Sequence, residues 1–370
     1  MSGGVDSSVA AALLVEQGYE VIGMMMRLWS ETGTGPATPA NRCCTPDQMA
    51  DARRVAEKLG IPFYVVDVRQ HFRQAIVQFF LDEHEAGRTP NPCIECNRQI
   101  RFTYLLERAL AMDADYLATG HYARIDHNAD GYVLKQGLDS NKDQTYVLHT
   151  FRQDQLARVL FPIGNYTKDE VREIARRFDL LVASKQESQD LCFLNDGDYR
   201  RFIRDNSIHM YQPGPILDQE GREMGRHEGL PFYTIGQRKG LGIAAAEPLF
   251  VLRKDPERNA LIIGPRDALG VRELVARGVN WISGTTPAAA IEAQVKIRYK
   301  ATPIPATVTP LDGDRAHVLF DQPAFGVTPG QAVVFYAGAV CLGGGLITNK
   351  KASGEEDKAP IVAAEAVYSW

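Results

Sequence analysis

The hydrophobic pattern in the first half of the chain predicts helices that alternate with short buried strands. Apolar positions recur at helical spacing, with capping residues or glycines at the ends, in residues 6–17, 45–60, from about 70, and 167–178. Short apolar runs occupy residues 21–26, 63–67 and 116–119. Strands separated by helices of this length form parallel sheets, so residues 1–200 are expected to form a doubly wound α/β domain.

The pattern changes after about residue 200. Glycine and proline interrupt short β-like runs, and from about residue 279 apolar and polar positions alternate, as in 293–299, 316–320 and 332–336. We therefore expect a small β-rich connector over 201–277 and a C-terminal antiparallel β-barrel over 278–348. Residues 349–370 are polar and charged, and are expected to be a disordered tail.

Composition narrows the class of protein without naming a function. A chain of 370 residues with 45% hydrophobic and 24% charged residues is expected to hold several globular domains. No apolar run of membrane-spanning length and no secretory signal are evident, so a cytoplasmic monomer with cysteines in a reducing compartment is expected. The net charge of −5 leaves an RNA partner open, because a local basic surface can still hold phosphates.

The first candidate site is a glycine loop that runs directly into a helix. Its residues are Ser2, Gly3, Gly4, Val5, Asp6, Ser7 and Ser8. The glycines allow close approach to an anion, the helix start supplies N–H donors, and Asp6 could hold Mg²⁺ beside phosphates. The loop lacks the Gly-Lys-Ser/Thr ending of loops that transfer a γ-phosphate, and its structural alternative is a capped helix after a glycine turn. Such a loop should follow a central strand, so the first strand of the domain is expected to be missing from this chain, through a misassigned start or a truncation.

The second candidate site consists of cysteines in polar, loop-like stretches. Cys93 and Cys96 follow two prolines that are expected to forbid helix, and Asn97 is expected to cap the next helix. Cys96 would then lie near a helix N-terminus, where thiolate is favoured. Cys192 is the other candidate, and the alternative for both is inert core.

Several longer motifs resemble one family. Ser-Gly-Gly-Val-Asp-Ser-Ser resembles the pyrophosphate loop of adenylating enzymes, which leave AMP on their substrate. The motifs at 90–97, 119–123, 142–146, 188–193 and 233–242 occur in the order seen in tRNA-specific 2-thiouridylases, and the similarity spans about residues 1–347.

This resemblance implies an activity and roles for individual residues. The enzyme would adenylate the 2-oxo group of the wobble uridine in tRNAs for Lys, Glu and Gln, then replace the oxygen with sulfur. Cys192 would carry a persulfide, obtained from a cysteine desulfurase or sulfur relay, and Cys96 would act as nucleophile, the two forming a transient disulfide. The glycine loop, Met26 and Gly120 would bind ATP with Mg²⁺. The residues expected to border the target base or touch tRNA are Asn91, Pro92, Cys93, His121, Lys142, Asp143, Gln144, Arg298, Tyr299 and Gln331.

One departure from the family keeps a second mechanism open. Many members have Asp where this chain has Cys93, so Cys93, Cys96 and Cys192 could instead hold a 4Fe-4S cluster. Another adenylating ligase and a non-catalytic RNA-binding protein are the rival functions. Zinc at Cys43 and Cys44 is disfavoured by their adjacent spacing, and Cys341 is expected to be core.

Overall fold

The computed structural model describes residues 1–31, 45–185, 191–194, 196–207 and 211–348. The predicted tail at 349–370 and the pair Cys43 and Cys44 lie outside the described residues.

The N-terminal part is built from parallel strand pairs and helices, which confirms the predicted α/β class. Strand β1 (Gly23–Arg27) pairs in parallel with β2 (Phe63–Asp67), and β3 (Leu117–Ala118) pairs in parallel with β6 (Val159–Leu160). Helix α1 (Val5–Glu16) packs against α2 (Pro46–Leu59) and α8 (Lys168–Arg177). In the described part of the chain β1 pairs only with β2, and β3 only with β6; the missing first strand stays a prediction.

The predicted start and end of α2 are both confirmed. The Thr45 side chain accepts a hydrogen bond from the Gln48 backbone N–H at 3.1 Å, and proline occupies the first turn, where no intrahelical N–H is needed. Gly60 ends the helix with φ of 67°, a conformation that glycine adopts without strain.

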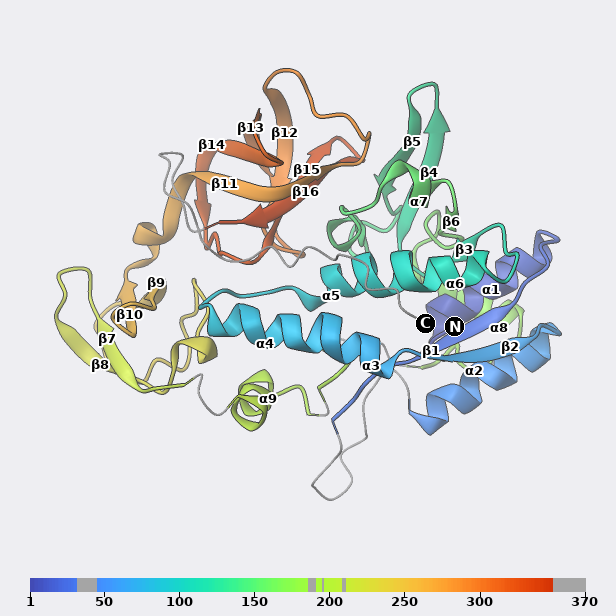
Figure 1. The fold of residues 1–370 in the computed structure, drawn as a ribbon, viewed down its shortest axis with the longest axis horizontal. Coiled ribbons are helices and arrows are strands. Elements are labelled where there is room, and N and C mark those ends of the chain that lie inside the picture. Colours follow the sequence, from blue (N-terminus) through green and yellow to red (C-terminus); the bar gives the residue numbers. More distant parts are fainter. Residues whose placement is uncertain (32–44, 186–190, 195, 208–210, 349–370) are drawn as a thin grey trace.

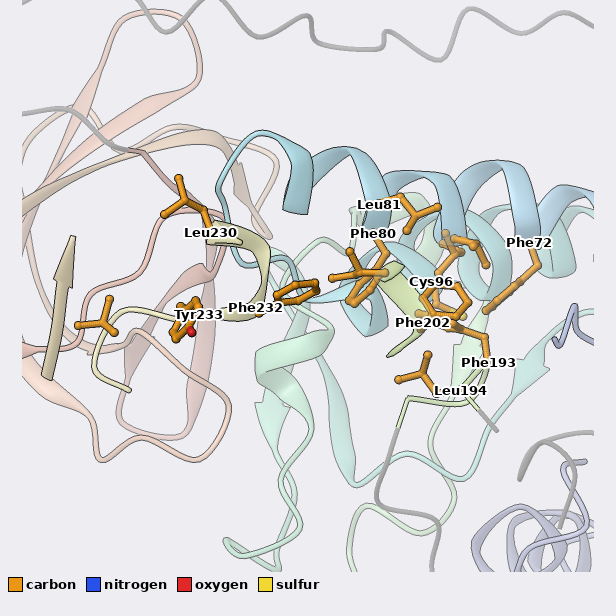
Figure 2. Close-up of a cluster of buried hydrophobic side chains, with 14 of the residues drawn as sticks. Phe72, Phe80, Leu81, Cys96, Phe193, Leu194, Phe202, Leu230, Phe232 and Tyr233 are labelled. Carbon is orange, nitrogen blue, oxygen red and sulfur yellow. The ribbon is translucent and has the colours of Figure 1, made fainter. Parts of the chain in front are cut away.

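Two long helical segments cross the middle of the molecule (Figure 1). The first runs through α3 (Arg69–Phe72), the π-helix η1 (Arg73–Val77) and α4 (Gln78–Glu85). The second runs through α5 (Pro92–Glu95), the π-helix η2 (Cys96–Leu105) and α6 (Leu106–Leu110). The two segments share one aromatic and aliphatic core with residues of the connector, including Phe232 (Figure 2).

The connector is a small mixed sheet preceded by α9 (Tyr199–Asn206). Its strands are β7 (Gly214–Leu217), β8 (Glu223–His227), β9 (Phe250–Asp255) and β10 (Ala260–Gly264), in the order β8-β7-β10-β9. Short 3₁₀ turns η4 (Leu230–Phe232) and η5 (Arg266–Leu269) flank it.

The C-terminal region is an antiparallel barrel, as predicted. Its strands are β11 (Gly270–Trp281), β12 (Ile291–Lys296), β13 (Ile304–Leu311), β14 (Arg315–Phe325), β15 (Ala332–Ala337) and β16 (Val340–Ile347). The order β11-β14-β13-β12-β15-β16 is closed by pairing of β11 with β16. Buried positions alternate along β12 and much of β14, and aliphatic side chains together with Phe320 and Phe335 fill the interior.

A hairpin of the N-terminal region extends this barrel sheet. Strands β4 (Ala123–Asn128) and β5 (Gly131–Gln136) pair with each other, and β5 meets β16 at Lys135 and Val340. The Gln136 N–H donates to the Ala339 carbonyl at 2.8 Å. The short elements η3 (Thr145–Val147) and α7 (Gln153–Leu156) follow the hairpin. In the part of the chain that the structure describes, no helix is both long and apolar enough to cross a bilayer.

Candidate active site

The glycine loop forms a tight turn at the start of α1. Gly3 has φ of 71°, and a Cβ added there would lie 2.3 Å from the Gln48 carbonyl oxygen, so only glycine fits. The Ser7 hydroxyl accepts from the Ser2 N–H at 3.0 Å, and the Ser8 hydroxyl donates to the Gly4 carbonyl at 2.9 Å. These bonds fix the loop where first-turn N–H groups can face an anion.

Two lysines from distant parts of the chain reach this loop. The Lys168 ammonium, at the start of α8, donates to the Asp6 carboxylate at 2.7 Å, and the Tyr122 hydroxyl donates to the same oxygen at 2.8 Å. The Lys185 ammonium donates to the Gly3 carbonyl at 2.9 Å and to Asp51 at 2.6 Å. Lys168 and Lys185 therefore place two positive charges beside the loop, each paired with a carboxylate, and an incoming phosphate would compete with Asp6 and Asp51 for them.

A cavity of about 680 Å³ opens beside the loop, within the size range of small-molecule sites. Residues from the loop, β1 and the segment after β3 line it, among them Ser2, Asp6, Ser7, Met26, Gly120 and His121. With Gln144, which also lines it, the structure thus brings seven predicted site residues to one cavity. The other loop residues, Gly3, Gly4, Val5 and Ser8, lie behind its lining and shape the turn.

Gly120 makes the closest approach to the loop. A Cβ added to it would lie 2.6 Å from the Asp6 carbonyl carbon and 2.7 Å from the Ser7 nitrogen. The end of β3 and the phosphate loop therefore pack backbone against backbone, which only a residue without a side chain allows.

His121 is held neutral beside a permanent cation. Burial, together with the nearby Arg101 charge, lowers the pKa of His121 to about 3. The Arg101 guanidinium lies 3.2 Å from Nε2 and can only donate, so Nε2 accepts and Nδ1 donates to the Thr119 hydroxyl at 2.7 Å. Arg101 also donates to the Asn97 side chain at 3.1 Å, which links the cavity to the cysteine-bearing helix.

That helix begins earlier than the sequence predicted. Asn91 caps α5 by accepting from the Cys93 N–H at 3.1 Å, and Pro92 occupies the first helical position. The prediction that the prolines forbid helix is wrong, because proline is tolerated where no intrahelical N–H bond exists. Asn97 therefore caps nothing; it lies inside the helix and donates to the Val147 carbonyl at 3.0 Å.

The two predicted reactive cysteines belong to one side-chain cluster. Cys96 is buried at the first position of η2 among aromatic residues, with Phe72, Phe80 and Phe193 nearby (Figure 2). Cys192, the neighbour of Phe193 in the chain, is half-buried and packs on the same cluster. The structure therefore brings the two segments together.

The described residues do not assemble the ligand set of a metal cluster. Cys93 is exposed on α5 while Cys96 is buried, and in the described ranges no three His, Cys, Asp or Glu side chains gather as a metal site needs. The three-cysteine alternative does not fit this arrangement.

The sequence matches three family models and is similar over nearly its whole length to named proteins. The family model described as tRNA methyl transferase HUP domain matches residues 1–196, the tRNA methyl transferase PRC-barrel domain matches 200–265, and the Aminomethyltransferase beta-barrel domain matches 271–347. The tRNA-specific 2-thiouridylase MnmA of Moorella thermoacetica is 52% identical over 350 residues, covering 94% of this chain and 98% of that protein. The protein of the same name from Pelotomaculum thermopropionicum is 49% identical, covering 94% and 95%.

The chain belongs to the tRNA-specific 2-thiouridylase family. Likeness to solved structures is weak: the U34-tRNA thiolase NcsA from Methanococcus maripaludis with its [4Fe-4S] cluster is 20% identical with a TM-score of 0.32, covering 57% of this chain and 63% of that one. Nothing about the site follows from that likeness.

In this 2-thiouridylase, several residues expected to touch tRNA also have contacts inside the protein. Asp143 is buried and accepts from the Thr145 N–H and hydroxyl at 3.2 and 2.9 Å, with the Lys296 ammonium at 3.6 Å. The Gln144 side chain accepts from the Tyr122 N–H at 2.9 Å. Tyr146, in the same segment but not among those residues, is buried, and burial raises the pKa of its hydroxyl above the ordinary value.

The predicted tRNA residues of the barrel lie near its contacts with the rest of the chain. Arg298 donates to the carbonyls of Ile235 and Gly326, and burial lowers the pKa of its guanidinium. Gln331 donates to the Thr89 carbonyl at 2.8 Å, and the Tyr299 ring lies 6.1 Å from that of Tyr146. Contacts of these residues with tRNA stay predictions.

Sequence reasoning missed Lys168, Lys185, Tyr122 and Arg101. Lys168 follows the capping threonine of α8, and Lys185 precedes the segment that leads to Cys192. Both lie in segments with recognisable local patterns, but only the tertiary fold shows which group each ammonium contacts.

Proposed function

We propose that this protein uses ATP to activate the 2-oxo group of the wobble uridine in tRNA and replaces that oxygen with sulfur, giving 2-thiouridine, AMP and pyrophosphate. One observation carries the proposal: a single helix, η2, bears Cys96 at its start and Arg101, which lines the cavity beside the phosphate loop. The adenylating site and the sulfur chemistry thus share one rigid element. The names of the relatives and the extent of the match support the same reaction.

The first step takes place in the cavity. The loop N–H groups, Lys168 and Lys185 would bind the phosphates of ATP, and Asp6 would hold Mg²⁺ together with phosphate oxygens. The uridine O2 attacks the α-phosphorus, the bond to the bridging oxygen of pyrophosphate breaks, and the 2-oxo group becomes an AMP ester that can leave. The positive Arg101 stands beside neutral His121 at this cavity and would stabilise negative charge on the phosphoryl oxygens.

The second step takes place at the cysteines. A donor protein transfers sulfane sulfur to Cys192, and the terminal sulfur of that persulfide attacks C2 of the activated uridine, expelling AMP. Cys96 thiolate then attacks the inner sulfur of Cys192, so that 2-thiouridine leaves and a Cys96–Cys192 disulfide forms. A thiol reductant returns both cysteines to thiols. Nucleophilic catalysis of this kind divides one difficult displacement into two easier steps.

The tRNA contacts are the remaining part of the proposal. Asn91, Pro92 and Cys93 at the start of α5 would border the target base, which must leave its stack to be reached. Lys142, Asp143 and Gln144, with Arg298, Tyr299 and Gln331 of the barrel, would meet the RNA, directly or by holding the loops that do. The tRNAs for Lys, Glu and Gln are the expected substrates, in a cytosolic reaction by a monomer.

The test follows all three products in one reaction. The protein is incubated with unmodified tRNA, ATP, Mg²⁺ and a persulfide source, and pyrophosphate, AMP and 2-thiouridine are measured together. We expect all three from the native chain and from a Cys341→Ala control in the buried barrel. Cys192→Ser should release pyrophosphate but neither AMP nor 2-thiouridine, because no persulfide displaces AMP, and Cys96→Ser should release pyrophosphate and AMP but no free 2-thiouridine. Full 2-thiouridine formation by either serine variant would contradict the persulfide route and revive another adenylating ligase.

Cys93→Ser separates the two sulfur routes. The two-cysteine route predicts that 2-thiouridine is still formed, aerobically and without added iron. A requirement for anaerobic iron reconstitution, lost in Cys93→Ser, would instead favour the cluster. If the folded native chain formed neither AMP nor 2-thiouridine, the proposed function would be wrong.

A further inference from the structure

A second, smaller cavity lies where three parts of the chain meet, away from the ATP cavity. It measures about 40 Å³ and lies between the end of α4, strand β9 and the loop before β15. Its lining includes Gly87, Thr89, Arg253, Lys254, Thr328 and Pro329. A water needs about 10–15 Å³ of such space, so the cavity admits about three oxygen atoms, enough for part of one tetrahedral oxyanion that enters from the surface but not for a larger organic group.

The cavity contains a buried lysine, and burial lowers the pKa of its ammonium to about 7. Lys254 is 8% exposed, and its Nζ has no hydrogen-bond partner among the described residues. The Thr89 hydroxyl, also in the lining, is buried and likewise lacks a partner in the described part of the chain. A buried ammonium is costly unless it is paired, and the described residues supply no hydrogen-bond partner for Lys254 Nζ, so an added anion would stabilise its charged form.

The neighbouring charges indicate the sign of such a partner. No aspartate or glutamate lines the cavity. The nearby Asp255 carboxylate is bonded to Arg253 at 3.2 Å. Lys254 is close enough to His84 for its charge to lower the pKa of that imidazole, after burial, to about 3, so two buried basic groups face each other. The donors present therefore call for an anion.

The cavity is accessible from the surface on one side. Arg253 lines it with a side chain that is 61% exposed, so an anion can approach along a second positive charge. Thr89 belongs to the segment that leads to Asn91, and its N–H donates to the Pro329 carbonyl at 3.0 Å. An anion here would join the connector to the segment that precedes α5.

We propose that this cavity binds the oxygens of one phosphate group, which accept hydrogen bonds from Lys254 Nζ and the Thr89 hydroxyl. The phosphate is either free inorganic phosphate or a phosphodiester of the bound RNA, and the second source rests on the proposed function. In both cases the anion compensates the charge of the buried ammonium. By binding Thr89, it also holds the segment that leads into the cysteine-bearing helix in place.

Two measurements distinguish the sources. The first is Tm of the full chain against inorganic phosphate at constant ionic strength. If free phosphate binds, Tm of the native chain rises by at least about 2 °C at saturation, whereas Lys254→Met shows no rise and an exposed-lysine control, Lys58→Met, behaves as the native chain. Methionine has similar length without charge, so the variant is expected to fold.

The second measurement is the salt dependence of tRNA binding, by filter binding or anisotropy. If a phosphodiester binds, Lys254→Met loses about one unit of the slope of log K against log salt, with no Tm response to free phosphate in the native chain. Thr89→Val keeps the lysine but removes one hydrogen-bond donor. It should therefore reduce, without abolishing, whichever effect Lys254→Met abolishes: the Tm rise with free phosphate or the unit of salt slope. A Tm response and a salt slope that are both unchanged in Lys254→Met would overturn the proposal. Neither readout requires 2-thiouridine formation, so failure of the reaction and failure of this site are told apart.

Discussion

The Lys168–Asp6 ion pair should contribute more to the free energy of unfolding than an exposed pair of the same type does. The variant Lys168→Met tests this. The Lys168 side chain is 10% exposed and that of Asp6 31%, with 2.7 Å between the charged atoms. At this distance and an effective dielectric of about 20, the gross attraction is about 6 kcal/mol. Desolvation of the lysine offsets most of that attraction.

The net effect follows from what the variant leaves behind. Tyr122 still donates to the Asp6 carboxylate, which is partly solvated, so the loss should fall below the 3–5 kcal/mol of a fully buried pair. We expect Lys168→Met to lower the free energy of unfolding by about 2 kcal/mol, as for one hydrogen bond to a charged group. Loss of one phosphate-facing charge should also raise KM for ATP by about tenfold or more.

Lys58→Met is the matched control. Lys58 pairs with Asp179, but these side chains are 44% and 88% exposed, so its removal should cost less than about 1 kcal/mol and leave KM unchanged. Urea unfolding followed by circular dichroism gives the stabilities, and AMP release against ATP concentration gives KM. Equal stability losses in the two variants, with the same KM for ATP, would refute the reasoning.

Three further perturbations follow from the site and its supports. Gly120→Ala should reduce AMP formation because its Cβ would displace the backbone of Asp6 and Ser7, whereas Gly225→Ala, whose Cβ meets only an Ile243 side chain at 3.5 Å, should not; equal rates would contradict this. Asp143→Asn should lower the free energy of unfolding in urea by about 3 kcal/mol, because it leaves the mostly buried Lys296 without its counter-charge. Burial is the main cause that lowers the pKa of His84 to about 3 in the folded chain. Below the ordinary histidine pKa the unfolded chain therefore binds a proton that the folded chain does not bind, so the free energy of unfolding decreases as the pH is lowered. From pH 7 to 5 this loss is about 2 kcal/mol, and His84→Gln should remove that part of the pH dependence; an unchanged profile would show that His84 is not buried neutral.

Local signals in the sequence predicted much of the fold. The threonine that caps α2, the glycine that ends it and the alternation of β12 and β14 each depend on residues close together in the chain. The glycine loop that leads into α1 was predictable for the same reason, because its glycines and serines are consecutive. These features need no knowledge of tertiary structure.

The groups that complete the site could not be predicted in this way. Lys168 and Lys185 contact the loop across 162 and 182 residues of sequence, and no local pattern shows that proximity. The helix around Cys96 was missed because proline breaks a helix interior but is tolerated at its first position, and the local sequence does not show which case applies. The decisive contact, the Asn91 cap, uses a residue that also suits a turn. The burial of Cys96 depends on aromatic residues from three separate segments.

The strand pairing between β5 and β16 bears on how this protein can be re-engineered. Chain segments that are far apart in sequence complete one another's sheet there, and Gln331 makes a second junction by donating a hydrogen bond to the Thr89 carbonyl. The barrel is therefore not an interchangeable module that could be exchanged for that of a relative at a single linker. A chimaera would have to carry the β4–β5 hairpin and the 87–91 segment along with the barrel, because these segments contact the barrel directly although they are far from it in sequence.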